Sequence, residues 1–172
     1  PEGPYSRDSG SGVDDLINSL MDNGYSPDKP SNIYAEIGST WRYLMRDSDQ
    51  AAHVMGKLLK YVGVDRVQWG TDSIWYGSPQ DQIMAFRAFQ ISDEFQEKYG
   101  YPEITPEIRA KVFGLNSAAA YGLSPDEVRK TTKVDPVEKA KEEYAENKDP
   151  SYLTYGPKNR REFLRFRAQE ER

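Results

Sequence analysis

The sequence lacks cysteine entirely and contains a single histidine, His53, among 172 residues. The absence of cysteine excludes disulfide bonds and metal sites built from thiolates. One histidine is also too few for a catalytic zinc site made by this chain alone, because such sites use about three protein ligands that converge on one ion. His53 lies among apolar residues in a predicted helix, and we interpret it as a core or surface residue rather than as a ligand.

Long apolar stretches are also missing. None approaches the roughly 20 residues that a membrane-spanning helix requires, and residues 1–12 lack the basic and apolar regions of a signal peptide. We therefore expect a soluble, cytoplasmic protein without a membrane partner. Basic residues are in deficit, since 23 Lys and Arg against 28 Asp and Glu give a net charge of −5. This deficit argues against a general nucleic-acid-binding protein, which neutralises phosphates with surplus basic residues.

The composition changes along the chain and predicts three segments. Residues 1–31 are interpreted as a loop or linker with one short helix, because apolar residues recur at helical spacing only over residues 13–23. Residues 32–123 contain alternating strand and helix patterns. Residues 124–172 combine few aliphatic side chains with many charges, and they are predicted to form a charged helical extension.

Two short runs of β-forming residues, 33–37 and 67–70, are predicted to form strands. Between them, residues 51–62 place apolar side chains on one helical face, and Gly63 marks the end of that helix. Strands separated by helices favour parallel βαβ units and hence an α/β fold. Two strands do not suffice for a parallel sheet buried on both faces, so we expect this chain to be the C-terminal part of a larger α/β protein.

Capping signals locate other helix starts. Asp47 or Ser48 is suited to begin the helix that precedes Gly63, and Thr105 is a predicted N-cap followed by Pro106 at the first helical position.

Asp72 follows the second predicted strand in the stretch "RVQWGTDSIW". In (β/α)₈ barrels, active-site residues lie at the C-terminal ends of the strands, which makes Asp72 a candidate functional residue. An aspartate after Gly-Thr also commonly caps the next turn, so a purely structural role is the alternative.

Three stretches resemble parts of a known family. "RVQWGTDSIW" and, further on, "KVFGLNSAAAYGL" are similar to the closing elements of the amidohydrolase superfamily, in particular its aminocarboxymuconate semialdehyde decarboxylase-like branch. "NIYAEIGS" resembles the preceding strand of that family. The resemblance covers roughly residues 32–123. It implies that the chain is the C-terminal part of a (β/α)₈ TIM barrel with extra C-terminal helices.

The resemblance also implies a metal-dependent hydrolase or, less often, a decarboxylase, acting on a small-molecule carbonyl substrate with a divalent metal ion, in the first place zinc. Asp72 matches the family aspartate that binds the metal or accepts a proton from the metal-bound water. The other family ligands are histidines that this sequence does not contain. We therefore expect the remainder of the barrel to come from a missing N-terminal portion or another chain, and this chain to be inactive alone.

Four further residues are candidate substrate-binding residues. Glu36 shares a strand face with Tyr34 and is expected either to meet substrate at the barrel mouth or to pair with an arginine inside the barrel. Trp41, Trp75 and Tyr76 follow the predicted strand ends. They are suited to line an apolar pocket, although packing is the simpler interpretation of buried aromatic residues.

A different class of function is an interaction domain that keeps the end of the barrel but not its chemistry. In that case the charged helices after residue 123 would serve as an arm. We expect these helices to wrap a neighbouring subunit or the outer surface of the barrel, and the protein to form a homo-oligomer.

Overall fold

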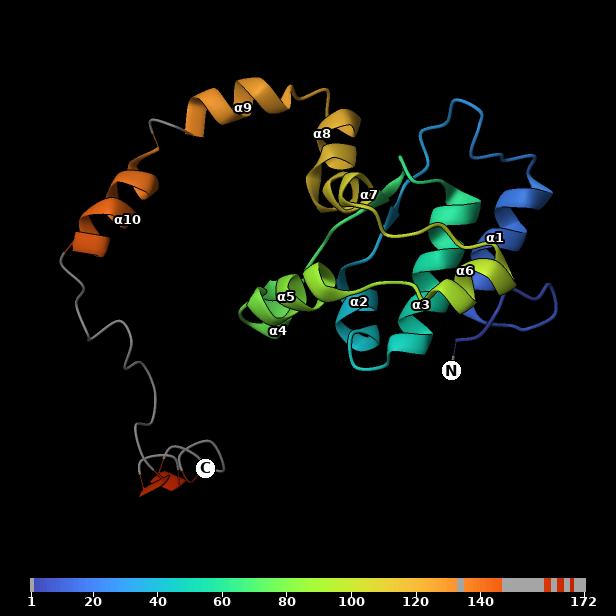
Figure 1. Ribbon diagram of the computed structural model, residues 1–172, viewed down its shortest axis with the longest axis horizontal. Helices are drawn as coiled ribbons and strands as arrows, with labels where there is room; N and C mark the ends of the chain where they lie inside the picture. The colour runs from blue at the N-terminus through green and yellow to red at the C-terminus, as the bar shows by residue number, and fades with distance from the viewer. Residues whose placement is uncertain (1, 133–134, 147–159, 162–163, 166–167, 169–172) are drawn as a thin grey trace. The chain divides into compact units, whose positions relative to one another are not determined.

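The computed structural model describes residues 2–132 and 135–146 together with positions 160, 161, 164, 165 and 168 (Figure 1). The chain divides into two compact units, Pro1–Pro125 and Asp126–Arg172. Much of the charged helical extension predicted over residues 124–172 lies outside the described residues. The first unit contains the sheet, the hydrophobic core and the candidate site.

Most of the first unit is helical. Its helices are α1 (Gly12–Asp22), α2 (Gly38–Leu44), α3 (Ser48–Lys57), α4 (Ser73–Tyr76), α5 (Gln80–Ala88), α6 (Asp93–Tyr99), α7 (Pro106–Ala110) and α8 (Asn116–Ala120), with π-helical segments η1 (Leu58–Val62) and η2 (Lys111–Leu115). Helix α9 (Pro125–Thr132) begins at the boundary of the units, and α10 (Pro136–Glu146) follows it. Within the described part of the chain, no helix combines the length and apolar character needed to cross a membrane.

The helix ends follow local side-chain chemistry. Asp47 is the N-cap of α3, and its carboxylate accepts hydrogen bonds from the next backbone N–H groups. Thr105 caps α7 in the same way, with Pro106 at the first helical position. At the other end, Gly63 terminates η1 with a φ of 108°, a backbone conformation that glycine adopts without steric cost. These three signals confirm the corresponding sequence predictions.

The sheet consists of two short strands, β1 (Ala35–Glu36) and β2 (Val67–Gln68), which run parallel with Glu36 opposite Gln68. Their parallel pairing was expected. The prediction of an α/β fold that forms the C-terminal part of a (β/α)₈ TIM barrel is wrong, because the structure is mostly helical and its described residues form only this two-stranded sheet.

Two local features limit the sheet. Ile37 is already the N-cap of α2, which begins at Gly38, and the predicted strand over residues 33–37 is reduced to the two residues of β1. On the other side, the backbone N–H of Trp69 donates to the carbonyl of Val112 in η2, at 2.9 Å. A helical segment thus takes the position beside β2 where a barrel would have its next strand.

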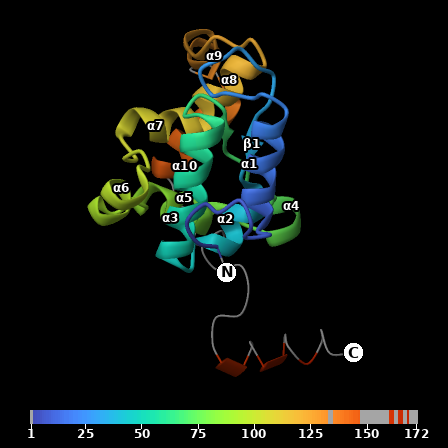
Figure 2. The same ribbon diagram turned by 90° about the vertical axis from the view of Figure 1, so that its right-hand side faces the viewer.

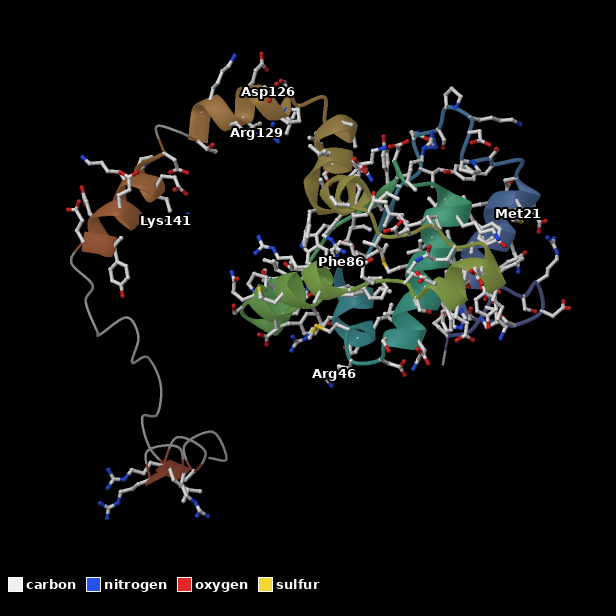
Figure 3. All side chains as sticks on the ribbon, viewed as in Figure 1. Met21, Arg46, Phe86, Asp126, Arg129 and Lys141 are labelled. Atoms are coloured by element: carbon white, nitrogen blue, oxygen red, sulfur yellow. The ribbon has the colours of Figure 1, made fainter. Side chains whose placement is uncertain are left out.

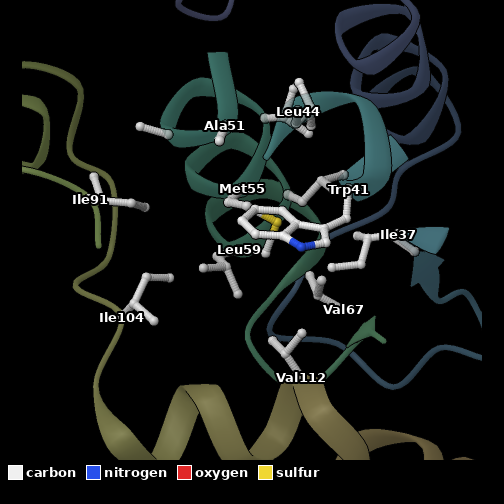
Figure 4. Packing of buried hydrophobic residues seen from close by; sticks show 14 of the residues in the cluster. Ile37, Trp41, Leu44, Ala51, Met55, Leu59, Val67, Ile91, Ile104 and Val112 are labelled. Atoms are coloured by element: carbon white, nitrogen blue, oxygen red, sulfur yellow. The ribbon is translucent and has the colours of Figure 1, made fainter. Parts of the chain in front are cut away.

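The hydrophobic core lies between α3, the sheet and the segment that leads into η2 (Figure 4). Trp41, Met55, Val67 and Val112 are each at most 1% exposed. Burial of side chains of this size stabilises the fold by about 1.5–3 kcal/mol each. Asn116, the first residue of α8, ties that helix to β2 by donating from Nδ2 to the carbonyl of Val67 at 2.8 Å.

Within the first unit, a buried lysine of α3 anchors the residues that precede α1. Lys57 is fully buried, and its Nζ donates to Glu2 and to Asp14 of α1, at 2.7 Å each. The backbone N–H of Glu2 also donates to Gln50. Helix α1 packs along the α3–η1 segment (Figure 2). Residues that the sequence pattern presented as a loop are therefore held in place by polar contacts.

The second unit is dominated by exposed charged residues (Figure 3). Arg129 pairs with Asp126 within α9, and Lys141 pairs with Glu138 within α10. Such exposed pairs contribute little to stability, on the order of 0–1 kcal/mol each.

Candidate acid–base site

Two carboxylates lie together where the parallel strands end. Glu36 is the last residue of β1, and Asp72 follows β2 by four positions. Glu36 Oε1 and Asp72 Oδ1 are each 2.8 Å from the position that a Cβ would take at Gly38. The lack of a side chain at Gly38 therefore leaves the space in which both carboxylates converge.

A second glycine completes this arrangement. At Gly70, a Cβ would lie 1.4 Å from Glu36 Oε1, a distance at which no side chain can be accommodated without displacement of the carboxylate. Glu36 as a whole is exposed, but its carboxylate group packs against Gly70 and accepts a hydrogen bond from the backbone N–H of Gly38 at 2.7 Å. The carboxylate pair can therefore adopt this arrangement only with glycine at positions 38 and 70.

The backbone of Asp72 is strained. It has a φ of 48° and a ψ of 33°, and it is the one non-glycine residue with positive φ in the described part of the chain. Residues held in such sparsely populated conformations concentrate at functional sites, although Asp tolerates this region better than most residues.

The side chain of Asp72 caps a helix, but not the helix that follows it. It makes no capping hydrogen bond to α4. Instead, Asp72 Oδ2 accepts from the backbone N–H of Ser39 at 2.8 Å and from its Oγ at 2.7 Å. Ser39 lies in the first turn of α2, so Asp72 satisfies a backbone donor there. Oδ1 has no hydrogen-bond partner among the residues that the structure describes.

Hydroxyl groups extend the site outward. Ser39 Oγ lies 3.0 Å from the hydroxyl of Tyr76, which lies 3.4 Å from that of Tyr43. The hydrogen bonds with Ser39 and Tyr43 lower the pKa of Tyr76. The guanidinium of Arg42 lies 5.7 Å from the centre of the Tyr76 ring, a distance at which a cation is attracted to an aromatic face.

The environment of Glu36 favours its protonated form. Burial of the carboxylate raises the pKa of Glu36, and the negative charge of Asp72 raises it further, while the hydrogen bond from Gly38 opposes both effects. Two neighbouring carboxylates, one of which holds its proton more tightly than usual, are a common arrangement for acid–base catalysis.

The structure brings some of the predicted site residues together and separates others. Glu36, Asp72 and Tyr76 belong to one cluster. Trp41 lies in the core, 1% exposed, and its indole N–H donates to the carbonyl of Gln82 at 3.0 Å. Trp75 is 77% exposed on α4.

His53 lies away from the carboxylates, in a buried aromatic cluster. Its ring stacks on Phe95, and its Nδ1 lies 3.1 Å from the hydroxyl of Tyr101. Its ring also meets that of Tyr99 edge to face. This placement agrees with the interpretation of His53 as a core residue.

Sequence reasoning missed Ser39, Tyr43 and the two glycines. The signal for the glycines was present, because each strand is followed within two residues by glycine and then by Ser or Thr, in "EIGST" and "QWGTD". Ser39 belongs to the first of these stretches and Tyr43 to neither, but the roles of both depend on contacts with residues more than 30 positions away.

The carboxylate pair does not by itself fit a zinc site. Zinc in hydrolases is held by about three protein ligands, usually including histidine. In the part of the chain that the structure describes, no group of three His, Cys, Asp or Glu side chains is placed to hold a metal ion. Glu36 and Asp72 offer oxygen donors only, so any metal bound there would need further ligands from elsewhere.

Comparison of the chain with family models, curated proteins and solved structures found no match. The resemblance to amidohydrolases therefore stays a prediction, and function is inferred from the geometry of the site.

Proposed function

We propose that this chain carries the acid–base part of a hydrolase site that acts on a small carbonyl compound. The observation that supports this proposal is the convergence of Glu36 Oε1 and Asp72 Oδ1 on the space left by Gly38. Asp72 Oδ1 accepts a proton from the attacking water, because its second oxygen is already occupied by Ser39. Glu36, with its raised pKa, donates a proton to the leaving group.

The amidohydrolase interpretation assigns Asp72 a further role as a ligand of a divalent metal ion, in the first place zinc. In that form of the proposal, the remaining ligands come from a missing N-terminal portion or from another chain, and this chain is inactive alone. Homo-oligomer formation and a cytoplasmic location likewise stay predictions.

A non-catalytic role is the second candidate, and the Ser39 contact favours it. An aspartate that joins the end of β2 to the start of α2 stabilises the fold whether or not it reacts with anything. The two candidates make different predictions for Asp72→Asn, since asparagine preserves the hydrogen-bond acceptor but cannot accept a proton from water.

The first experiment measures turnover. In the protein assembled with any partner that completes the site, we expect Asp72→Asn to lower kcat for a chromogenic carboxylic ester by about two to four orders of magnitude. Asp81→Asn is the matched control, because it removes an exposed carboxylate from α5. Wild-type turnover in Asp72→Asn would contradict the catalytic assignment.

The second experiment tests the carboxylate pair in the chain itself. Carbon-detected NMR titration should give a Glu36 pKa above that of an ordinary glutamate, and Asp72→Asn should lower it by removing the neighbouring charge. Gly70→Ala should also change it, because the new methyl group displaces the Glu36 carboxylate. A Glu36 pKa that is identical in all three proteins would exclude coupling between the two carboxylates.

A further inference from the structure

A surface cleft of about 480 Å³ lies between the end of α5 and helix α7. Arg87 and Gln90 line it from the α5 side, and Arg109 and Phe113 line it from the side of α7 and η2. Ile104, which precedes α7 in the chain, also lines it. None of the residues of the acid–base site lines this cleft. It is therefore a separate feature of the first unit.

Arg109 gives the cleft a half-buried positive charge. Its Nη2 donates to the carbonyl of Phe89 at 2.9 Å, and its Nη1 donates to that of Phe86. These carbonyls end α5, where the helix dipole favours a cation. A guanidinium has more N–H groups than these two bonds use, so Arg109 retains donors for a ligand.

Among the residues that the structure describes, no carboxylate forms an ion pair with Arg87 or Arg109 of the cleft. Burial lowers the pKa of Arg109, and no neighbouring carboxylate counteracts this effect. Although the sequence has 28 acidic residues, this half-buried guanidinium has no carboxylate partner within the described part of the chain, so it is available to an anionic ligand.

Apart from the two arginines and Gln90, the lining of the cleft is apolar. Ile104 is 1% exposed, and the half-buried ring of Phe113 lies against the core aromatic residues Phe86 and Trp69. A cleft with guanidinium donors and a hydrophobic floor is complementary to a ligand that is charged at one end and apolar at the other.

We propose that this cleft binds a small organic carboxylate, with the carboxylate group held by Arg87 and Arg109 and the apolar body placed against Phe113 and Ile104. The amide of Gln90 is positioned in the same lining to donate a further hydrogen bond. This site goes beyond the proposed hydrolase function and does not depend on it.

The test uses 3-phenylpropionate as the probe on the full chain, with isothermal titration calorimetry as the readout. Wild-type protein should bind it more tightly than 3-phenylpropionamide, which has no charge, and more tightly than acetate, which has no apolar body. Arg87→Gln should weaken binding of the carboxylate about tenfold or more, because it removes a charge-assisted hydrogen bond.

Arg46→Gln is the matched control, since it removes the same charge from an exposed arginine outside the cleft (Figure 3). It should leave the affinity within about twofold of wild type, as should Asp72→Asn. Arg87 is itself exposed, so its replacement leaves the core unchanged.

Three results would overturn the proposal. The first is equal affinity of the wild-type protein for 3-phenylpropionate and 3-phenylpropionamide. The second is an affinity for 3-phenylpropionate that does not change in Arg87→Gln. The third is a loss of affinity in Arg46→Gln as large as that in Arg87→Gln, which would mean that binding depends only on net charge. If the hydrolase assay shows no turnover while 3-phenylpropionate still binds, the proposed hydrolase function is contradicted and the proposed binding cleft is not.

Discussion

The carboxylate of Asp72 accepts hydrogen bonds from both the backbone N–H and the hydroxyl of Ser39, although 33 positions separate the two residues in the chain. This contact joins the loop after β2 to the first turn of α2. It uses Oδ2 of Asp72, whereas Oδ1 faces the space shared with Glu36. Structural and chemical roles are thus divided between the two oxygens of one side chain.

Two substitutions of Asp72 should distinguish its structural role from its chemical role through the free energy of unfolding, in addition to turnover. Asp72→Ala removes the acceptor for Ser39 and leaves alanine in a left-handed conformation, so we expect a loss of about 2–3 kcal/mol in the free energy of unfolding. Asp72→Asn should lose less than about 1 kcal/mol, because asparagine accepts hydrogen bonds and tolerates this conformation. Urea denaturation, with Asp81→Ala as the control, measures both. Equal stability of Asp72→Ala and Asp81→Ala would mean that the Ser39 contact does not stabilise the fold.

Gly56 in α3 should not tolerate alanine. Its Cβ would lie 2.3 Å from the ring of Tyr101, so the methyl group would force helix and ring apart. Glycine-to-alanine changes inside helices usually stabilise by about 1 kcal/mol, but here we expect destabilisation by about 1–3 kcal/mol. Gly12→Ala in α1 is the control, because open space surrounds that position. Thermal unfolding should show opposite or clearly unequal effects, and similar melting temperatures for the two variants would contradict the packing of Tyr101 on Gly56.

Stability should depend on pH through His53. Burial lowers the pKa of His53 in the folded protein, and the charge of Lys57 lowers it further. The unfolded chain, in which histidine has a pKa of about 6.5, therefore binds the proton more readily. His53 therefore does not reduce the free energy of unfolding above a pH of about 6.5. As the pH falls from there toward the folded-state pKa, the free energy of unfolding decreases, with a slope of at most about 1.4 kcal/mol per pH unit.

His53→Gln isolates this contribution, because glutamine does not titrate. The difference in unfolding free energy between wild type and His53→Gln should change as the pH falls from 7 toward about 5. Carboxylates that titrate in this range do so in both proteins and cancel in the difference. A constant difference over that range would exclude His53 as the titrating group.

Lys57→Met should be among the most destabilising single substitutions in the chain. It leaves the carboxylate of Asp14, which is 1% exposed, and that of Glu2 without their cation. Breaking a buried ion pair by removing one partner costs about 3–5 kcal/mol. The double variant Lys57→Met with Asp14→Leu should recover part of this loss, since it replaces buried charges by apolar groups. Chemical denaturation of both variants and of Lys139→Met, an exposed control, measures the effect.

Helix starts and ends were predictable because their causes are local. The N-caps Asp47 and Thr105 bind backbone N–H groups within the next helical turn, and Gly63 ends η1 through its own backbone conformation. All three were identified from the sequence. The parallel direction of the two strands was also predictable, since a helix connects them.

The extent of the sheet could not be predicted in this way. Whether residues near Ile33 and Gly70 remain extended depends on partners far along the chain, such as the carbonyl of Val112 that takes the N–H of Trp69. Distant contacts also decide the position of Trp41. Its place after a predicted strand made it a candidate for substrate binding, but it packs against Phe86 in the core. Of the candidate site, Asp72, Glu36 and Tyr76 were proposed from their positions relative to the strands, whereas Ser39 could be included only once its contact with Asp72 was known.

The ion pair between Glu2 and Lys57 also orders events during biosynthesis. Glu2 is synthesised 55 residues before the lysine that binds it, so the N-terminal segment emerges from the ribosome without its partner. Its carboxylate has only water as a partner until α3 exists, and the ion pair forms only when that segment packs against α3. Formation of the ion pair between Glu2 and Lys57 therefore marks the moment at which the two ends of this 55-residue span have closed.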